Sequence, residues 1–209
     1  MRCGGVVLCG GQSSRMGSSK AWLPFGPEFM LPRVVRLVSE AVSPVVVVAA
    51  VDQELPPLPA NVLIARDEIP ESGPLAGIVA GLTALETSVD AAFVSSCDVP
   101  LLRPALVAAL VSRLEMHAEK DIITAYDAAA DRAQPLTAVY RLRILPALRD
   151  RLANRQLRVR DLMTFLPTLH VPVDDLRSID PDLHSLLNIN RPEEYHAALR
   201  LAGYESPAT

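Results

Sequence analysis

Short apolar runs alternate with longer segments of mixed polarity along most of the chain. Such runs are typical of strands that are buried on both faces of a sheet. They predict strands at Val6–Leu8, Val45–Ala50, Val62–Ala65, Ala91–Ser95 and Ile122–Ala125.

Between these runs, apolar residues recur every three or four positions, which is the spacing of one helix face. This spacing predicts helices at Leu31–Val42 and Leu106–Leu114. Another helix is predicted to begin at Pro74, because proline is favoured in the first turn of a helix. Regular alternation of helices with apolar strands indicates a mostly parallel, doubly wound sheet.

The second half of the chain follows a less regular pattern. It predicts strands at Leu136–Tyr140 and Leu169–Val173, and helices at Ile144–Leu152 and Val159–Leu166. A last helix is predicted from Pro192, where two glutamates suit the positive end of a helix dipole. No linker or repeat interrupts the pattern, so we expect a single Rossmann-like α/β domain over residues 1–209.

The composition narrows the classes of function. The 209 residues carry a formal net charge of −4, which disfavours nucleic acid as a partner. The longest apolar stretch, Val45–Val51, is far shorter than the ~20 residues of a membrane-spanning helix. We therefore expect no membrane partner. Cys3, Cys9 and Cys97 form no CxxC pair, so we expect reduced thiols in a cytoplasmic protein and an inert, buried Cys97.

A glycine-rich loop follows the first predicted strand. Gly10 and Gly11 let backbone N–H groups approach an anion closely, and Arg15 and Lys20 add positive charge for a triphosphate. The loop matches neither the Walker A motif nor GxGxxG. A surface loop with two solvated cations is the alternative, but the combination directly after a strand favours phosphate binding.

Residues 8–20 read Leu-x-Gly-Gly-x-Ser-x-Arg-Met-Gly-x-x-Lys, which resembles the signature of molybdenum cofactor guanylyltransferases. Three further segments, Gly73–Ile78, Cys97–Pro100 and Asn188–Glu194, resemble a second glycine motif, a metal-binding turn and a closing motif of that family. The four segments occur in the family's order. Together they are far more specific than any one of them.

The resemblance implies a fold of the nucleotide-diphospho-sugar transferase type and a reaction. GTP and molybdenum-bearing molybdopterin would give the guanine dinucleotide cofactor and pyrophosphate. It also implies a nucleotide-binding part at about residues 1–125 and an acceptor-binding part at about 126–204. Mg²⁺ is the expected cofactor, with Mn²⁺ as the alternative. Transient contacts with molybdoenzymes or cofactor-delivery proteins are a further implied class of partner.

The implied site residues divide into three groups. Lys20 and Arg15 would stabilise charge on the leaving phosphates, while Asp98 would hold the metal. The nucleotide would be bound by the residues Leu8, Cys9, Gly10, Gly11, Lys20, Asp67, Gly73, Gly77 and Asp98. The acceptor would be bound by Asn188, Asn190 and Arg158.

Asp98 has a physical basis for its role apart from the resemblance. It follows a predicted strand at the carboxyl end, where open α/β sheets bind ligands. A carboxylate there can hold Mg²⁺ together with phosphate oxygens. The alternative is a turn or cap aspartate before Pro100.

Gly73 and Gly77 lie at a predicted helix N-terminus, which attracts phosphate, although Gly77 would equally serve close packing. Asn188 and Asn190 alternate around Ile189, so on a strand end both amides would project to one side. Such amides can donate and accept hydrogen bonds, which suits a pterin edge or a phosphate. Capping of the next helix is the alternative for Asn190.

Charged residues at two further places have solvated roles as alternatives to ligand binding. A solvated loop charge is the alternative for Asp67. For most of the arginines at positions 155, 158 and 160, a solvated helix face is favoured over acceptor binding.

One position departs from the family pattern. The second strand of the family typically ends in an asparagine-containing turn, whereas this chain has Val48, whose side chain cannot form a hydrogen bond. We therefore expect backbone groups to recognise the base. Molybdopterin cytidylyltransferases and sugar-phosphate nucleotidyltransferases remain alternatives, and so does a nucleotide-binding module without turnover.

Overall fold

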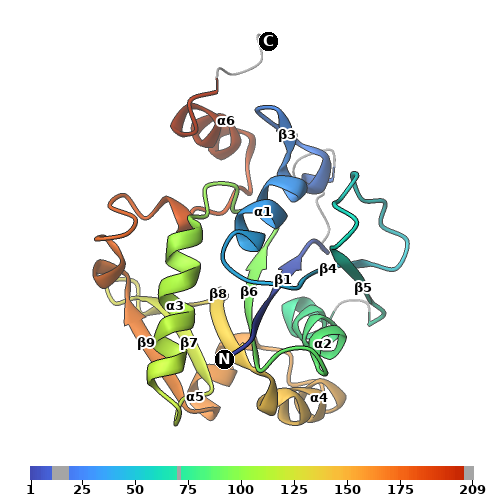
Figure 1. Cartoon of the computed structure of the whole chain (residues 1–209), viewed down its shortest axis with the longest axis vertical. Coiled ribbons are helices and arrows are strands. Elements are labelled where there is room, and N and C mark those ends of the chain that lie inside the picture. Colours follow the sequence, from blue (N-terminus) through green and yellow to red (C-terminus); the bar gives the residue numbers. More distant parts are fainter. Residues whose placement is uncertain (11–18, 70–71, 205–209) are drawn as a thin grey trace.

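The computed structural model describes residues 1–10, 19–69 and 72–204. Its centre is a seven-stranded sheet with the order β5-β4-β1-β6-β8-β7-β9 (Figure 1). The strands are β1 (Cys3–Leu8), β4 (Val45–Ala50), β5 (Leu63–Asp67), β6 (Ala91–Ser96), β7 (Ile122–Asp127), β8 (Arg132–Arg141) and β9 (Thr168–Pro172). Six strands run parallel to one another, and the predicted mostly parallel α/β sheet is confirmed.

The exception is β8, which lies between β6 and β7 and runs antiparallel to both. The turn between β7 and β8 spans only residues 128–131, and so short a connection can join only antiparallel neighbours. Phe93 of β6 and Ile123 of β7 both pair with Val139 of β8. The two parts of the chain therefore share one sheet.

Helices cover both faces of the sheet. The α1 (Met30–Ser39) and α3 (Pro104–Met116) helices pack on one face, and α2 (Gly73–Leu85), α4 (Leu145–Ala153) and α5 (Val159–Phe165) pack on the other. Alternate residues of β1 face opposite sides, because side chains alternate along a strand. Val7 joins the core beneath α1 and α3, whereas Val6 joins the core beneath α2.

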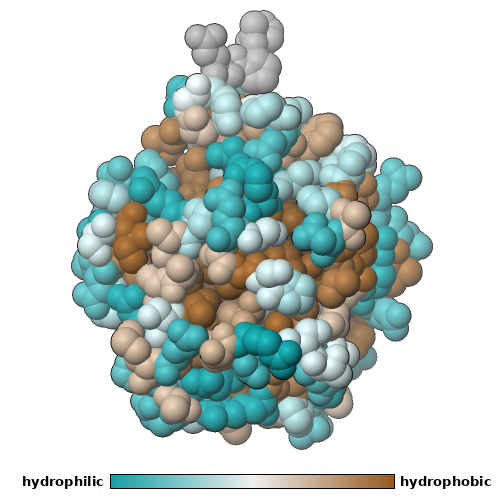
Figure 2. Space-filling view, viewed as in Figure 1, coloured by the Kyte–Doolittle hydropathy of each residue, from teal (hydrophilic) through white to brown (hydrophobic). Residues whose placement is uncertain are grey.

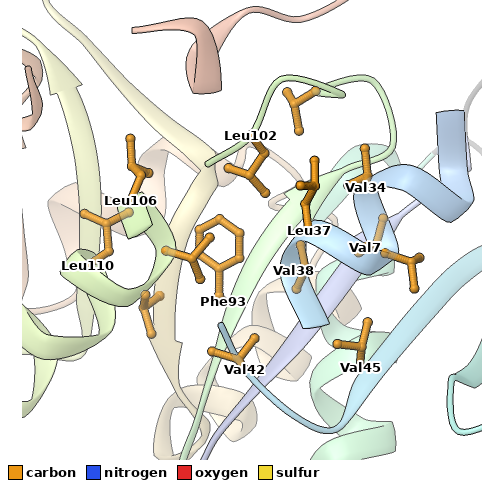
Figure 3. Packing of buried hydrophobic residues seen from close by; sticks show 14 of the residues in the cluster. Val7, Val34, Leu37, Val38, Val42, Val45, Phe93, Leu102, Leu106 and Leu110 are labelled. Carbon is orange, nitrogen blue, oxygen red and sulfur yellow. The ribbon is translucent and has the colours of Figure 1, made fainter. Parts of the chain in front are cut away.

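Branched aliphatic side chains fill the first of these cores (Figure 3). Phe93 of β6 lies at its centre, between Val38 of α1 and Leu110 of α3. On the other face, α2 approaches β1 closely, because a side chain at Gly81 would meet Val6 at 2.4 Å. These two cores hold the carboxyl ends of β1 and β6 in place.

The structure corrects several element boundaries and adds elements that the pattern missed. The helix predicted to reach Val42 ends at Ser39, because a turn leads into Pro44 and the next strand. A short hairpin, β2 (Pro24–Phe25) and β3 (Glu28–Phe29), was not predicted. Neither were the 3₁₀ turns η1 (Lys20–Trp22), η2 (Leu142–Ile144), η3 (Val173–Leu176) and η4 (His184–Leu186).

The last helix, α6 (Pro192–Leu201), packs with the hairpin in a third small core that contains Phe25, Ile189 and Tyr195 (Figure 1).

Polar and apolar residues are interspersed on the face of the molecule in Figure 2. Within the described residues, none of the helices has the length and apolar character needed to cross a bilayer.

Candidate functional site

An ion pair lies at the carboxyl ends of β1 and β6. The Lys20 Nζ atom, in η1, is 2.9 Å from Oδ2 of Asp98, which follows β6. The two side chains are 17 % and 14 % exposed, so they are accessible to a ligand but partly shielded from water. A charged hydrogen bond in such surroundings fixes both groups more firmly than one on an open surface. The predicted phosphate-binding lysine and the predicted metal ligand are thus brought together.

Two asparagines complete this polar cluster. Asn188 donates from Nδ2 to Oδ1 of Asp98 at 3.0 Å, and Lys20 donates to Oδ1 of Asn190 at 2.9 Å. Between them, Ile189 is buried and its N–H donates to the Asp98 carbonyl at 2.9 Å. We define Lys20, Asp98, Asn188 and Asn190 as the polar cluster. It unites three segments that are far apart in the sequence.

The expectation that the two asparagines lie on a strand was wrong, because residues 187–190 form no strand. The alternation survives because this extended segment buries Ile189 in the third core, which turns Asn188 toward Asp98 and Asn190 toward Lys20. The side chain of Asn190 does not cap α6. The Glu194 carboxylate does so instead, accepting the N–H groups of Asn190 at 2.6 Å and Arg191 at 3.1 Å.

A buried aspartate supports the segment that carries the asparagines. Asp180 is fully buried, accepts the Ser185 N–H at 2.7 Å, and lies 3.2 Å from the Arg103 guanidinium. The Arg103 N–H in turn donates to the Ser185 hydroxyl at 2.9 Å. These contacts tie the approach to Asn188 to the start of α3 and so support the polar cluster.

The glycine end of β1 lies beside the end of β4. Gly10 is exposed, and the Gln53 amide donates to the Cys9 carbonyl at 3.0 Å and accepts the Ala50 N–H at 3.2 Å. The Arg66 guanidinium donates to the carbonyls of Ala50 and Gln53, both at 2.9 Å. Side chains therefore hold the main chain in the region where a base was expected to bind. Gly11 and Arg15 lie outside the described residues.

Two thiols meet next to this region. Cys9 and Cys97 are both 6 % exposed. The neighbouring Cys97 thiol lowers the pKa of Cys9, whereas contact with Cys9, followed by burial, raises the pKa of Cys97. Cys97 is buried, as expected, and its contact with a second thiol was not foreseen.

The other residues that were predicted to bind the nucleotide do not gather at the polar cluster. Asp67 ends β5, and its carboxylate accepts the Ile69 N–H at 3.1 Å in a local turn. Gly73 starts α2 with φ +60°, a conformation that favours glycine. Gly77 packs against Leu8, since a side chain on it would lie 3.1 Å from the leucine. This supports the packing alternative for Gly77. The nucleotide-binding roles of Leu8, Asp67, Gly73 and Gly77 remain predictions.

Arg158 lies apart from the polar cluster. It lines an open cavity of about 640 Å³ beside α4 and α5, together with Arg151, Arg155 and the exposed Phe165. The Arg151 guanidinium stacks over the Phe165 ring at 5.2 Å. The acceptor role predicted for Arg158 stays a prediction.

Sequence reasoning missed Ser96, Gln53 and Arg66. The Ser96 hydroxyl donates to Oδ1 of Asp98, two residues later in the chain. Polar residues at the ends of buried strands were the available signal, because that is where parallel sheets bind ligands. Ser96 directly precedes the Cys97-Asp98 motif, and Gln53 lies in the turn after β4.

A family model described as the MobA-like NTP transferase domain matches residues 5–169. A probable molybdenum cofactor guanylyltransferase of Chloroflexus aggregans is 34% identical over 93% of this chain and 92% of the relative. A molybdenum cofactor guanylyltransferase of Desulfosudis oleivorans is 31% identical, with 93% of each chain covered.

Solved structures agree on the fold. Molybdopterin-guanine dinucleotide biosynthesis protein A from Archaeoglobus fulgidus superimposes with a TM-score of 0.77 at 22% identity, covering 96% of this chain and 98% of that one. A cytidylyltransferase from Leptospira borgpetersenii gives a TM-score of 0.71 at 17% identity, with coverages of 99% and 89%. The motif resemblance is confirmed by the family match and the curated relatives, and the chain belongs to the MobA-like NTP transferase family, alongside the molybdenum cofactor guanylyltransferases.

Proposed function

We propose that this protein transfers GMP from GTP to molybdenum-bearing molybdopterin in the cytoplasm and releases pyrophosphate. The observation that carries the proposal is the polar cluster, in which one cation, one carboxylate and two amides converge at the carboxyl edge of the sheet. The names of the relatives supply the substrates. Transient contact with molybdoenzymes or cofactor-delivery proteins belongs to the same proposal.

The proposed chemistry is one phosphoryl displacement. An oxygen of the acceptor's terminal phosphate attacks the α-phosphorus of GTP and forms a new P–O bond. The bond from that phosphorus to the bridging oxygen breaks, and pyrophosphate leaves in line. Such a reaction needs positioning and charge neutralisation rather than a covalent enzyme intermediate. The polar cluster supplies groups for both tasks.

Each residue of the cluster has a distinct part in this proposal. Lys20 neutralises charge on the leaving phosphates, with Arg15 as its predicted partner. Asn190 and Asp98 fix the Lys20 ammonium in place, since it donates to both of them. Asn188 holds one oxygen of Asp98 and offers an amide to the acceptor. Gly10 leaves the end of β1 open to the nucleotide.

A divalent metal fits this site, and we propose Mg²⁺. Within the described residues, no three His, Cys, Asp or Glu side chains are grouped to form a metal cage. Asp98 nevertheless offers a hard carboxylate, and Mg²⁺ commonly binds through one or two carboxylates plus substrate phosphates. Once bound, the metal would supply charge neutralisation between two anionic reactants.

The test is a competition between GTP, CTP and ATP for molybdopterin with the purified protein. We expect a product that contains mainly guanine, together with one pyrophosphate for each acceptor consumed. A site that satisfies the hydrogen-bonding groups of one base rejects another strongly, because its own polar groups would be left unpaired. Mainly cytosine in the product would overturn the guanylyltransferase proposal in favour of a cytidylyltransferase. Binding without pyrophosphate release would point to a module without turnover.

Replacing Val48 with alanine should not change the preference for GTP over CTP. Val48 is 2 % exposed and packs in the core beneath α2, so it faces away from any ligand. We expect a loss of about 1–3 kcal/mol in the free energy of unfolding, measured in urea.

Gln53→Ala is the contrasting variant, because it removes the amide that holds the Cys9 carbonyl. It should raise KM for GTP while costing less stability, since Gln53 is half-buried. A changed GTP preference in Val48→Ala with none in Gln53→Ala would contradict recognition of the base through the main chain of β1.

A further inference from the structure

Cys9 and Cys97 directly follow two adjacent parallel strands. The register pairs Leu8 with Ser96, the last residues of β1 and β6, and the cysteines are the next residue after each. The Cys97 N–H donates to the Leu8 carbonyl at 2.9 Å, so the strands are still held together at this point. Both side chains lie in the core beneath α1 and α3, which means that they project from the same face of the sheet.

This arrangement is compatible with the geometry of a disulfide. Neighbouring strands lie about 4.8 Å apart, and the Cα atoms of disulfide-bonded cysteines are usually about 4.4–6.8 Å apart. Both residues are 6 % exposed and lie at the edge of the sheet where the nucleotide is proposed to bind, which leaves a small oxidant a route to them.

We propose that Cys9 and Cys97 are a redox modification site that a peroxide oxidises to a reversible intramolecular disulfide. One cysteine thiolate attacks the peroxide oxygen, which gives a sulfenic acid and one water or alcohol molecule. The second thiol then attacks the sulfenic sulfur and releases water. Two thiols are oxidised and one peroxide is reduced by two electrons, and a dithiol reverses the change by exchange.

The disulfide would alter both parts of the nucleotide site. A disulfide allows only a narrow range of Cβ separations, about 3.5–4.5 Å, so it would lock the ends of β1 and β6 against each other. The Gln53 amide now donates to the Cys9 sulfur at 3.4 Å as well as to the Cys9 carbonyl, and a bonded sulfur would displace it. Cys97 directly precedes Asp98 of the polar cluster. Oxidation should therefore weaken nucleotide binding.

Cys3 provides an internal control. It lies at the opposite end of β1 from Cys9, six residues or about 20 Å of strand away, so it cannot reach either partner. It is half-buried, and burial raises the pKa of its thiol to about 12. Peroxide should leave this cysteine reduced.

The experiment treats the purified chain with dilute hydrogen peroxide, alkylates the remaining thiols, and maps the product by mass spectrometry. We expect one disulfide that joins the Cys9 and Cys97 peptides, with Cys3 alkylated. Cys3→Ala should form the same disulfide, whereas Cys97→Ala and Cys97→Ser should form none. Thermal melting checks that each variant is folded, and the two Cys97 variants guard against a packing defect in one of them.

Binding of GTP, CTP and ATP is measured on the same samples, so that the choice of base does not decide the result. We expect the best-bound nucleotide to lose at least about tenfold in affinity on oxidation, and dithiothreitol to restore it. In Cys97→Ala the affinity should not respond to peroxide. A disulfide that involves Cys3, the absence of a disulfide, or unchanged nucleotide affinity in the oxidised protein would overturn the inference. The disulfide map does not use turnover, so a failure of the proposed transfer reaction would be recognised separately.

Discussion

Asp98→Asn is expected to remove almost all turnover and to leave the protein folded. The asparagine keeps the shape and one oxygen of the side chain but loses the negative charge. That charge holds Lys20 at 2.9 Å and is the proposed ligand for the metal. Loss of several kcal/mol of transition-state stabilisation should lower the rate at least about 10³-fold.

The measurement is metal-dependent pyrophosphate release from GTP in the presence of molybdopterin, with thermal melting in parallel. Asp150→Asn is the matched control, because it makes the same chemical change on an exposed position of α4. It should release pyrophosphate at the wild-type rate. A folded Asp98→Asn variant with near-normal turnover would remove Asp98 from the catalytic site.

The central sheet was predictable because its signals are local. Runs such as Val45–Ala50 are apolar on both faces, and only a strand covered by helices on both sides accommodates them. Pro74 and Pro192 mark the starts of α2 and α6 for an equally local reason, the fixed backbone angle of proline. The antiparallel insertion of β8 was not predictable in this way, because it depends on pairing with strands far along the chain.

The polar cluster was predicted residue by residue but not as a set of contacts. Lys20 was a candidate as a cation of the glycine-rich loop, Asp98 for its place at a strand end, and the two asparagines for the closing motif that resembles the family. The approach of the two asparagines to Lys20 and Asp98 depends on the burial of Ile189 in the third core, a tertiary contact that no local pattern reveals. Gln53 was missed because its place after a buried strand marks it only as a polar residue near the sheet edge, whereas its hydrogen bonds to Cys9 and Ala50 depend on the fold.

Lys20→Ala is expected to lower kcat about 10²–10³-fold, with a smaller change in KM for GTP. Asp98 and Asn190 both accept hydrogen bonds from the Lys20 ammonium, so the charge is in position before the leaving phosphates develop theirs. Such preorganised charge acts mainly on the transition state, which is why the effect should fall on kcat.

The fold should tolerate this change. The Lys20 side chain is 17 % exposed, and it contributes to none of the three hydrophobic cores. Lys120→Ala removes the only other lysine of the chain and is the matched control, with no expected effect on rate. Single-turnover measurements would separate the chemical step from product release. Lys20→Ala could match the wild type in kcat/KM while Asp98→Asn did not. The ion pair would then serve to orient the carboxylate, and other groups would have to neutralise the charge on the leaving pyrophosphate.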